Sequence, residues 1–267
     1  MRAALIPAPA GKGIVFRRDD LGGAEIAALH DRVAETRLGT VIAENGARVA
    51  VVEHAMAALA GAGIDDLVVA LDGPELPILD GDALSWLELL DRAGTREQRG
   101  AQHRIRIARR VEATCGDAFA ALAPAESLSF DFEISFASAA IGTQHLFWPF
   151  TGDAFRRDIA PARTFGFASE LEALRTAGLA IGASLDNTLA VDGDRIVNPK
   201  LQRFQDEFVR HKILDAIGDL ALAGAPVVGR FEGRRSGHSL NNALLRALFA
   251  DPSNYEVIQE TAPCTSH

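Results

Sequence analysis

The chain has 267 residues, 48% of them apolar and 24% charged, and a formal net charge of −9 at pH 7. This length suffices for one large or two small domains with their own cores, and no apolar run approaches the roughly 18 residues that a transmembrane helix requires. The acidic balance argues against a general nucleic-acid-binding protein, because binding of that kind depends on Lys and Arg neutralising phosphates.

The N-terminal part of the chain alternates short apolar runs with turn residues. The first residues carry one Arg and an early Pro, which fits a strand better than a secretory signal and predicts a cytoplasmic protein. Two predicted strands flank the dipeptide Asn45-Gly46, which is typical of a tight hairpin turn. Helical patterns follow in AMAALAGAG and DALSWLELLDRAG, with the strand pattern DDLVVALDG between them.

A polar stretch, residues 96–103, predicts a linker to a second part that also mixes strands and helices. The predicted strands of this part are IRIARRVEA, FAALAP, SLSFDFEISF and VVGRFEG, and its predicted helices are SELEALRTAG, a long one from about 204 to 223, and SLNNALLRALFAD. A hairpin is expected around Asp192-Gly193. The polar residues 253–267 predict a disordered tail. Its Cys264 and Cys115 are too few for a disulfide framework.

Two segments share a faint common pattern. Residues 53–73 and 210–233 each run from a His through a helical pattern and LAGA to a strand and a Gly. The helical patterns differ in length, so the similarity could be chance. If it is real, it indicates two related α+β units, each sending one His from the start of a helix toward a shared cleft.

Side chains that bind metals recur at the helix starts. His211 and Asp215 are four residues apart, so on a helix they lie on one face about a turn apart. A catalytic zinc normally takes three protein ligands from His, Asp and Glu, and His54 is the third candidate. This set predicts a site for Zn²⁺, with Fe²⁺ as the other metal to consider.

Acid–base chemistry is indicated by the neighbours of these ligands. Glu53 precedes His54, and a carboxylate that lies beside a metal without coordinating it can take a proton from the attacking water. His238, once protonated, could stabilise an oxyanion and protonate a leaving amine. Asp219, one turn beyond Asp215, could hold that imidazolium in place. An HExxH motif is absent, so a zincin protease is not supported.

Each of these residues also has a plain interpretation. An HxxxD pair is common and on its own is a metal pair in about one case in ten. His238 alone could be a surface histidine, Asp219 a solvated helix charge and Lys212 an exposed lysine. The hypothesis therefore depends on the combination.

The combination resembles a known family. The segments VEHAMAALAGAGIDDLVVALDGPELPILDG, PARTFGF, LQRFQDEFVRHKILDAIGDL and SGHSLNNALL are similar to the signature segments of UDP-3-O-acyl-N-acetylglucosamine deacetylases, the zinc amidases of lipid A biosynthesis. The resemblance runs from about residue 1 to 250. It implies an α+β fold of two similar β-α-α-β domains packed with the active site between them. On this basis we expect an N-terminal domain at 1–97 and a C-terminal domain with an acyl-passage insert at 103–252.

The resemblance also assigns roles to single residues. It implies that zinc binds to His54, His211 and Asp215, that Glu53 is the general base, and that His238 backed by Asp219 is the cationic partner of the oxyanion. Thr164 corresponds to a hydroxyl that helps to stabilise the tetrahedral intermediate. The implied reaction is hydrolysis of the acetamide of UDP-3-O-acyl-N-acetylglucosamine, a nucleotide-sugar lipid precursor.

Further residues are implied to bind this substrate. Lys212 corresponds to a contact with the nucleotide sugar, and Arg235 would add positive charge for the pyrophosphate. Phe136 matches a position where an aromatic ring can stack on uracil, and Phe165 begins the segment, up to Val197, that could line the acyl chain. Ordinary core packing remains the alternative for these apolar residues.

The chain departs from the family pattern at two places. Family members usually begin with a further strand that carries a G-[LV]-H-[ST]-G turn, and this chain starts at what looks like their second strand. Ala118 stands where a basic residue is frequent, which bears on diphosphate affinity. Two other functions are therefore weighed: a non-catalytic paralogue that binds a UDP-sugar or an acyl ligand, and an amidase of the same mechanism acting on another N-acetyl sugar. We expect a monomer.

Overall fold

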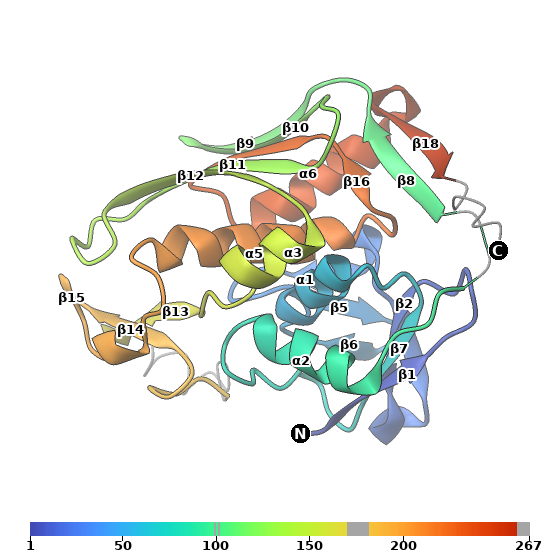
Figure 1. Ribbon diagram of the computed structural model, residues 1–267, viewed down its shortest axis with the longest axis horizontal. Coiled ribbons are helices and arrows are strands. Elements are labelled where there is room, and N and C mark those ends of the chain that lie inside the picture. The colour runs from blue at the N-terminus through green and yellow to red at the C-terminus, as the bar shows by residue number, and fades with distance from the viewer. Residues whose placement is uncertain (99, 101, 170–181, 261–267) are drawn as a thin grey trace.

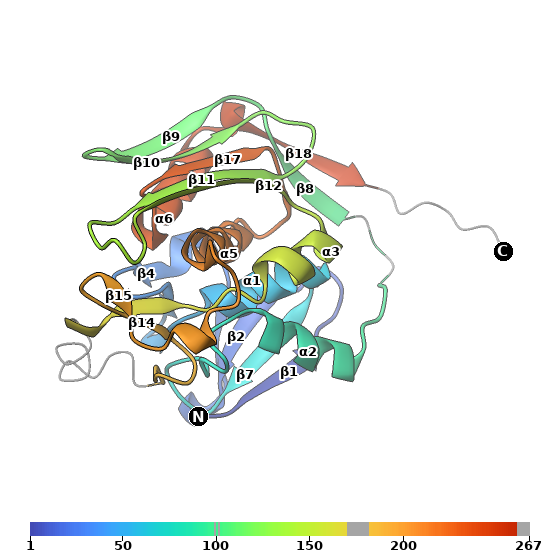
Figure 2. The same ribbon diagram turned by 60° about the vertical axis from the view of Figure 1, so that its left-hand side comes forward.

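Two sheets form the outer layers of the molecule, and helices fill the space between them (Figures 1 and 2). The structure is a computed structural model and describes residues 1–98, 100, 102–169 and 182–260. Its mixture of helices with parallel and antiparallel strands confirms the predicted α+β class.

The N-terminal sheet has the strand order β1-β7-β2-β3. Its strands are β1 (Ala3–Pro7), β2 (Ile14–Arg18), β3 (Ala24–Ala27) and β7 (Leu67–Leu71). β7 pairs antiparallel with β1 and parallel with β2, and all of its residues are buried. This burial explains the unbroken apolar sequence LVVAL, because a strand that is covered on both faces has no polar side.

A small sheet of β4 (Val33–Glu35), β5 (Val41–Glu44) and β6 (Ala47–Val49) lies beside it. Asn45 and Gly46 join β5 to β6 with φ angles of 50° and 82°. Positive φ at both positions is what a type I′ hairpin turn requires, so the predicted hairpin is confirmed.

The C-terminal sheet has the order β12-β11-β17-β10-β9. Its strands are β9 (Val111–Cys115), β10 (Ala118–Ala123), β11 (Ser129–Ser135), β12 (Thr143–Pro149) and β17 (Arg230–Arg234). β11 pairs antiparallel with β12 and parallel with β17. The alternating sequence of β11 buries Phe130, Phe132 and Ile134 against the helices.

Two more sheets complete the strands. One joins β8 (Gln102–Ile107) to β16 (Val227–Val228) and β18 (Tyr255–Glu260), and the other joins β13 (Phe165–Phe167), β14 (Leu189–Asp192) and β15 (Arg195–Ile196). The predicted strands IRIARRVEA and VVGRFEG are therefore each divided between two sheets. The hairpin expected around Asp192-Gly193 is the turn between β14 and β15.

The prediction of a disordered tail at 253–267 is wrong for its first part. Residues 252–254 form a short 3-10 turn, and β18 pairs with β8 along its whole length. Backbone hydrogen bonds along a strand edge do not need an apolar sequence, and Tyr255 packs against Phe249 at 5.1 Å between ring centroids. Residues 261–267 lie outside the described part. The predicted linker is also too long, because its last two residues already belong to β8.

The helices are α1 (Glu53–Ala62), α2 (Leu84–Ala93), α3 (Gly152–Ala154), α5 (Glu207–Ala221) and α6 (His238–Ala250). Short helical turns occur at Asp19–Leu21, His30–Arg32, Phe155–Ile159, Pro199–Leu201 and Pro252–Asn254. The predicted helix SELEALRTAG falls almost wholly outside the described residues. Among the described residues, no helix has both the length and the apolar character needed to cross a bilayer.

The crossing of α1 and α5 between the two sheets positions the site (Figure 1). A Cβ on Gly218 would lie 2.0 Å from the backbone oxygen of Glu53, far inside contact distance. Glycine at this position therefore lets the C-terminal part of α5 touch the first turn of α1. One continuous apolar cluster, which includes Ala57 of α1 and Ile217 of α5, surrounds the crossing.

Candidate metal centre

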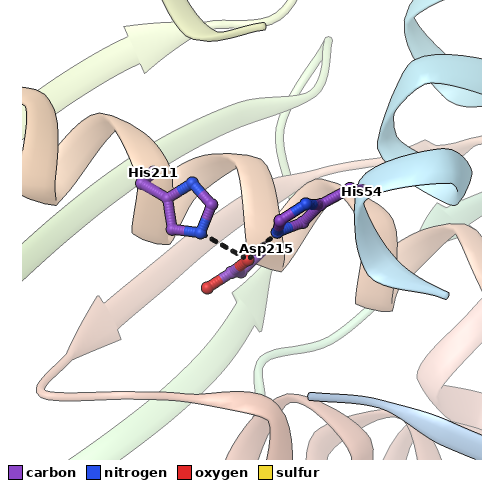
Figure 3. Close-up of side chains that lie close together, drawn as sticks. All are labelled: His54, His211 and Asp215. Atoms are coloured by element: carbon purple, nitrogen blue, oxygen red, sulfur yellow. Dashed lines mark ion pairs between the residues drawn. The ribbon is translucent and has the colours of Figure 1, made fainter. Parts of the chain in front are cut away.

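Three side chains meet where α1 crosses α5 (Figure 3). His54 is the second residue of α1, and His211 and Asp215 lie one turn apart on α5. His211 Nε2 is 3.3 Å and His54 Nε2 is 3.8 Å from the same oxygen, Asp215 Oδ1. One ligand atom from each residue lies within 4.8 Å of the other two, and all three residues are buried. The sequence hypothesis required this convergence.

The unpartnered atoms of this cluster fit a cation. Within the described part of the chain, neither Asp215 Oδ1 nor His54 Nδ1 has a hydrogen-bond partner, although both are buried. A buried carboxylate oxygen without a donor costs about 1 to 3 kcal/mol or more. Ligands of Zn²⁺ lie about 2.0 to 2.2 Å from the ion, so neighbouring ligand atoms are roughly 3 to 3.5 Å apart. The distance from His211 Nε2 to Asp215 Oδ1, 3.3 Å, lies in this range, and that from His54 Nε2, 3.8 Å, is slightly longer.

The protonation states also suit metal binding. Burial lowers the pKa of His54 to about 3 and also lowers the pKa of His211, so both imidazoles are neutral at pH 7. Burial alone would raise the pKa of Asp215, but the ammonium group of Lys212 and the imidazole of His211 hold it below its ordinary value. Neutral imidazole and ionised carboxylate are the forms that bind a metal.

Glu53 lies beside the three ligands with its carboxyl group buried. Its Oε2 accepts a hydrogen bond of 2.9 Å from the backbone N–H of Thr40. Gly39 makes this approach possible, because a Cβ there would lie 2.6 Å from Glu53 Oε1. Burial raises the pKa of Glu53 to about 7, against the opposing effect of His238. A carboxyl group with this pKa can both take and return a proton near neutral pH.

His238, the first residue of α6, faces the same cluster. Its Nδ1 lies 2.9 Å from Asp219 Oδ2, and its Nε2 lies 3.8 Å from Asp215 Oδ2. Burial opposes a charge on this ring, but Asp219 and Asp215 outweigh it and raise the pKa of His238 to about 9. His238 is therefore an imidazolium at neutral pH, and it is held by a carboxylate as the sequence suggested.

The predicted substrate residues fall into two groups. Phe165 lies 6.1 Å from the His211 ring, measured between ring centroids, and so borders the metal cluster. Phe136 lies one ring further out, 5.7 Å from Phe165. Lys212 Nζ lies 2.7 Å from Asp215 Oδ2 and so neutralises that carboxylate. Arg235 is exposed and pairs with Asp117 at 3.7 Å, and no ion pair, hydrogen bond or ring contact joins its side chain to the other three.

Thr164 immediately precedes β13. Its backbone N–H donates to Gly81 O at 2.8 Å, and its carbonyl accepts from Leu189 at 2.9 Å. The residue is half-buried, and its hydroxyl makes no hydrogen bond to a described residue. Two residues earlier, the carbonyl of Ala162 accepts from His211 Nδ1 at 3.1 Å.

The sequence did not indicate the residues whose hydrogen bonds position Asp219 and, through it, His238. The Thr40 hydroxyl donates to Asp219 Oδ1 at 2.5 Å, and Asn241 Nδ2 donates to Asp219 Oδ2 at 2.8 Å. Ser236 in turn donates to Asn241 at 2.8 Å. A signal for Asn241 existed, since it lies three residues after His238 on a helix. No local signal could have linked Thr40 to a residue 179 positions away.

Comparisons of the sequence with a family model and with curated proteins all match the same family of deacetylases. Residues 1–250 match the family model described as LpxC, UDP-3-O-acyl N-acetylglycosamine deacetylase. A protein of Phenylobacterium zucineum named UDP-3-O-acyl-N-acetylglucosamine deacetylase is 53% identical over 96% of this chain and 88% of its own length. Proteins with the same name from Anaeromyxobacter sp. and Myxococcus xanthus are 46% and 47% identical, over 97% and 95% of this chain and 84% and 81% of their own lengths.

Proposed function

Because this chain belongs to the LpxC family of UDP-3-O-acyl N-acetylglycosamine deacetylases, we propose that it hydrolyses the acetamide of UDP-3-O-acyl-N-acetylglucosamine. The products are acetate and the free amine, in the biosynthesis of lipid A. The observation that carries the proposal is the unpartnered, buried Asp215 Oδ1, which faces two neutral imidazoles beside a buried carboxyl group and a histidine cation.

The proposed ligands of the metal are His54, His211 and Asp215. When bound, Zn²⁺ acts as a Lewis acid toward the acetamide carbonyl and lowers the pKa of water. Fe²⁺ accepts the same imidazole and carboxylate ligands. The neutral imidazoles contribute no charge, and Asp215 contributes one negative charge, which also pairs with Lys212 through its other oxygen.

Glu53 is the proposed general base. It takes one proton from the water whose oxygen attacks the carbonyl carbon, and the carbonyl π electrons move onto oxygen. The pKa of about 7 suits this exchange, since a stronger acid would not hold the proton. The hydrogen bond from the backbone N–H of Thr40 holds one oxygen of the carboxylate in place.

His238 is the proposed electrostatic partner and acid. Its imidazolium stabilises the negative charge on the oxygen of the tetrahedral intermediate, and the Thr164 hydroxyl is proposed to donate a second hydrogen bond. As the C–N bond breaks, Nε2–H gives its proton to the leaving amine. Asp219 then holds the neutral ring through Nδ1–H until a new proton arrives.

Substrate contacts are proposed for both groups of residues. Phe136 is proposed to stack on uracil, Lys212 to contact the nucleotide sugar, and Arg235 to attract the diphosphate. Phe165 opens the proposed acyl passage, and a small apolar hollow supports it that is lined by residues of 166–168 and 183–190, among them Phe167 and Leu185.

We further propose a cytoplasmic monomer. The free, exposed thiol of Cys115 is typical of a reducing compartment.

Substitution of Glu53 tests the proposed reaction. We expect Glu53→Gln to keep the metal and lose at least 100-fold in acetate release, because general-base catalysis contributes about 10² to 10⁴ in rate. Zinc content by elemental analysis and acetate release from the UDP substrate are measured on the same preparation. Full activity of the zinc-loaded variant would refute the role of Glu53. A zinc-loaded wild type without acetate release would instead favour a non-catalytic paralogue.

A further inference from the structure

A single peptide group lies against the first turn of α5 and is bound at both ends by that helix. The carbonyl of Ala162 accepts from His211 Nδ1 at 3.1 Å, and the next N–H, that of Arg163, donates to Glu207 Oε1 at 2.8 Å. Glu207 and His211 are four residues apart, so they project from the same face of the helix. The two side chains therefore clamp one peptide plane between them.

The carbonyl end of this clamp fixes the chemistry of His211. A carbonyl oxygen can only accept, so Nδ1 of His211 must carry the hydrogen. Nε2 then presents its lone pair, and Nε2 is the atom that lies 3.3 Å from Asp215 Oδ1. The position of the Ala162 carbonyl thus decides which nitrogen of His211 is available to a metal.

The amide end of the clamp is a carboxylate with no exposure to solvent. Glu207 is 0% exposed, and besides Arg163 N it accepts from the backbone N–H of Phe204 at 3.0 Å and from that of Arg203. Three backbone donors offset the cost of burying the carboxylate. The helix dipole at the start of α5 favours a negative group there as well.

Within this arrangement, the Glu207 carboxylate and the His211 ring each bond to the peptide between them. The Arg163 side chain is held elsewhere, by Asp80 at 2.7 Å and by the carbonyl of Leu201 at 2.5 Å. A negative partner on a peptide N–H polarises the same peptide and makes its carbonyl a stronger acceptor. Glu207 can therefore strengthen the hydrogen bond that orients His211 without touching the ring.

We propose that Glu207 is a positioning residue of the metal centre, which acts through the Ala162–Arg163 peptide to set the tautomer and orientation of His211. The inference rests on the proposed function, because it assumes that His211 binds a metal. Partners that orient a metal-binding histidine typically contribute 10- to 100-fold in metal affinity. A role limited to holding the start of α5 would affect folding but not the choice of ring nitrogen.

The variant Glu207→Gln tests this with Asp206→Asn as its matched control. Glutamine keeps the size of the side chain, but its NH₂ group cannot accept from a backbone N–H. Asp206→Asn also removes one negative charge at the start of α5. The Asp206 carboxylate, however, accepts a hydrogen bond of 2.6 Å from Arg210 Nε and not from the clamped peptide. The zinc dissociation constant is measured for the three proteins by competition with a chelator.

We expect zinc to bind 10- to 100-fold more weakly to E207Q and within about twofold of wild type to D206N. Nitrogen-15 spectra of the metal-free proteins are expected to show His211 as the Nδ1–H tautomer in wild type and as a mixture in E207Q. An unchanged zinc affinity in E207Q, or an equal loss in both variants, would overturn the proposal.

Two further results separate this inference from the function on which it rests. If wild type binds no zinc, the proposed function fails, while the tautomer comparison still decides the role of Glu207. If E207Q does not fold, Glu207→Asp takes its place, since it keeps the charge but withdraws the carboxylate from Arg163 by one methylene. A wild-type zinc affinity and tautomer in that folded variant would contradict the proposal.

Discussion

At the scale of single residues, Asp219 on α5 joins the segment before β5 to the start of α6. It accepts hydrogen bonds from Thr40, which precedes β5, from His238 at the start of α6, and from Asn241. Thr40 also binds Glu53 through its backbone N–H. The proposed base and the proposed acid are therefore positioned by a common network, and a change at Asp219 should reach His238 first.

The pKa of His238 provides a prediction at this scale. In metal-free protein we expect it to titrate near 9, and Asp219→Asn should lower its pKa because the facing carboxylate is lost. Because folding raises the pKa of His238 above 6.5, the protonated ring stabilises the folded state. This contribution is complete below pH 6.5 and is lost as the pH rises through 9. The difference is on the order of 3 kcal/mol.

Histidine ring spectra and thermal unfolding of the two metal-free proteins between pH 6 and 10 measure both effects. The stability gap between wild type and Asp219→Asn should narrow as the pH rises, by the part that the His238 cation contributes. A His238 that titrates near 6.5 in both proteins, with a gap independent of pH, would show that Asp219 does not hold a cation.

The residue scale also shows what sequence can predict about such a site. His211 and Asp215 were found because helical spacing alone brings them together, and their convergence with His54 followed from the family resemblance and the paired helix starts. Thr40 and Glu207 could not be found in this way. Glu53 accepts from the backbone N–H of Thr40, and Glu207 accepts from that of Arg163; every residue type except proline has such a group, so no pattern of side chains marks these partners.

At the scale of elements, the crossing of α1 and α5 depends on the single position Gly218. In an ordinary helix interior, Gly→Ala stabilises by roughly 0.4 to 1 kcal/mol. Here the new Cβ would lie 2.0 Å from Glu53 O and 2.7 Å from Glu53 C, both backbone atoms that cannot turn aside.

We therefore predict that Gly218→Ala destabilises the fold by at least about 1 to 3 kcal/mol and weakens zinc binding, because it separates His54 from Asp215. Denaturant unfolding and zinc titration measure the two effects. Gly166→Ala is the control, since a Cβ at Gly166 meets no atom within 4 Å. A Gly218→Ala variant as stable as wild type would mean that the helices are not in contact at this point.

Elements also mark the limit of sequence prediction for the fold. The hairpin at Asn45-Gly46 and α1, α2 and α6 were predicted because turn chemistry and helical period are local. The division of one apolar run into β8 and β9 was not, since it depends on β16 and β18, which pair with β8 from more than 100 residues away. The same distant pairing explains the strand in the polar tail.

At the scale of the whole molecule, we propose two domains, residues 1–97 and 103–252, with α1 of one facing α5 of the other. Each proposed domain supplies one of the two outer sheets (Figure 2). His54 comes from the first domain, and His211 and Asp215 come from the second. A metal bound by all three would therefore link the two domains.

This linkage predicts that removal of the metal lowers the melting temperature of the whole protein. A ligand present at 1,000 times its dissociation constant stabilises the folded state by about 4 kcal/mol, and each kcal/mol corresponds to roughly 2 to 4 °C in a protein of this size. Calorimetry with and without a chelator measures the shift. His54→Ala should show a much smaller shift, and an equal shift in that variant would exclude His54 as a ligand.

The central claim is that His54, His211 and Asp215 bind one ion between them. Anomalous diffraction from crystals of the zinc-loaded protein, recorded on both sides of the zinc absorption edge, tests it most directly. The account predicts one strong peak within about 2.0 to 2.2 Å of an imidazole nitrogen of His54, of His211 Nε2 and of Asp215 Oδ1. A zinc-loaded crystal whose anomalous peak lies away from these atoms would contradict it.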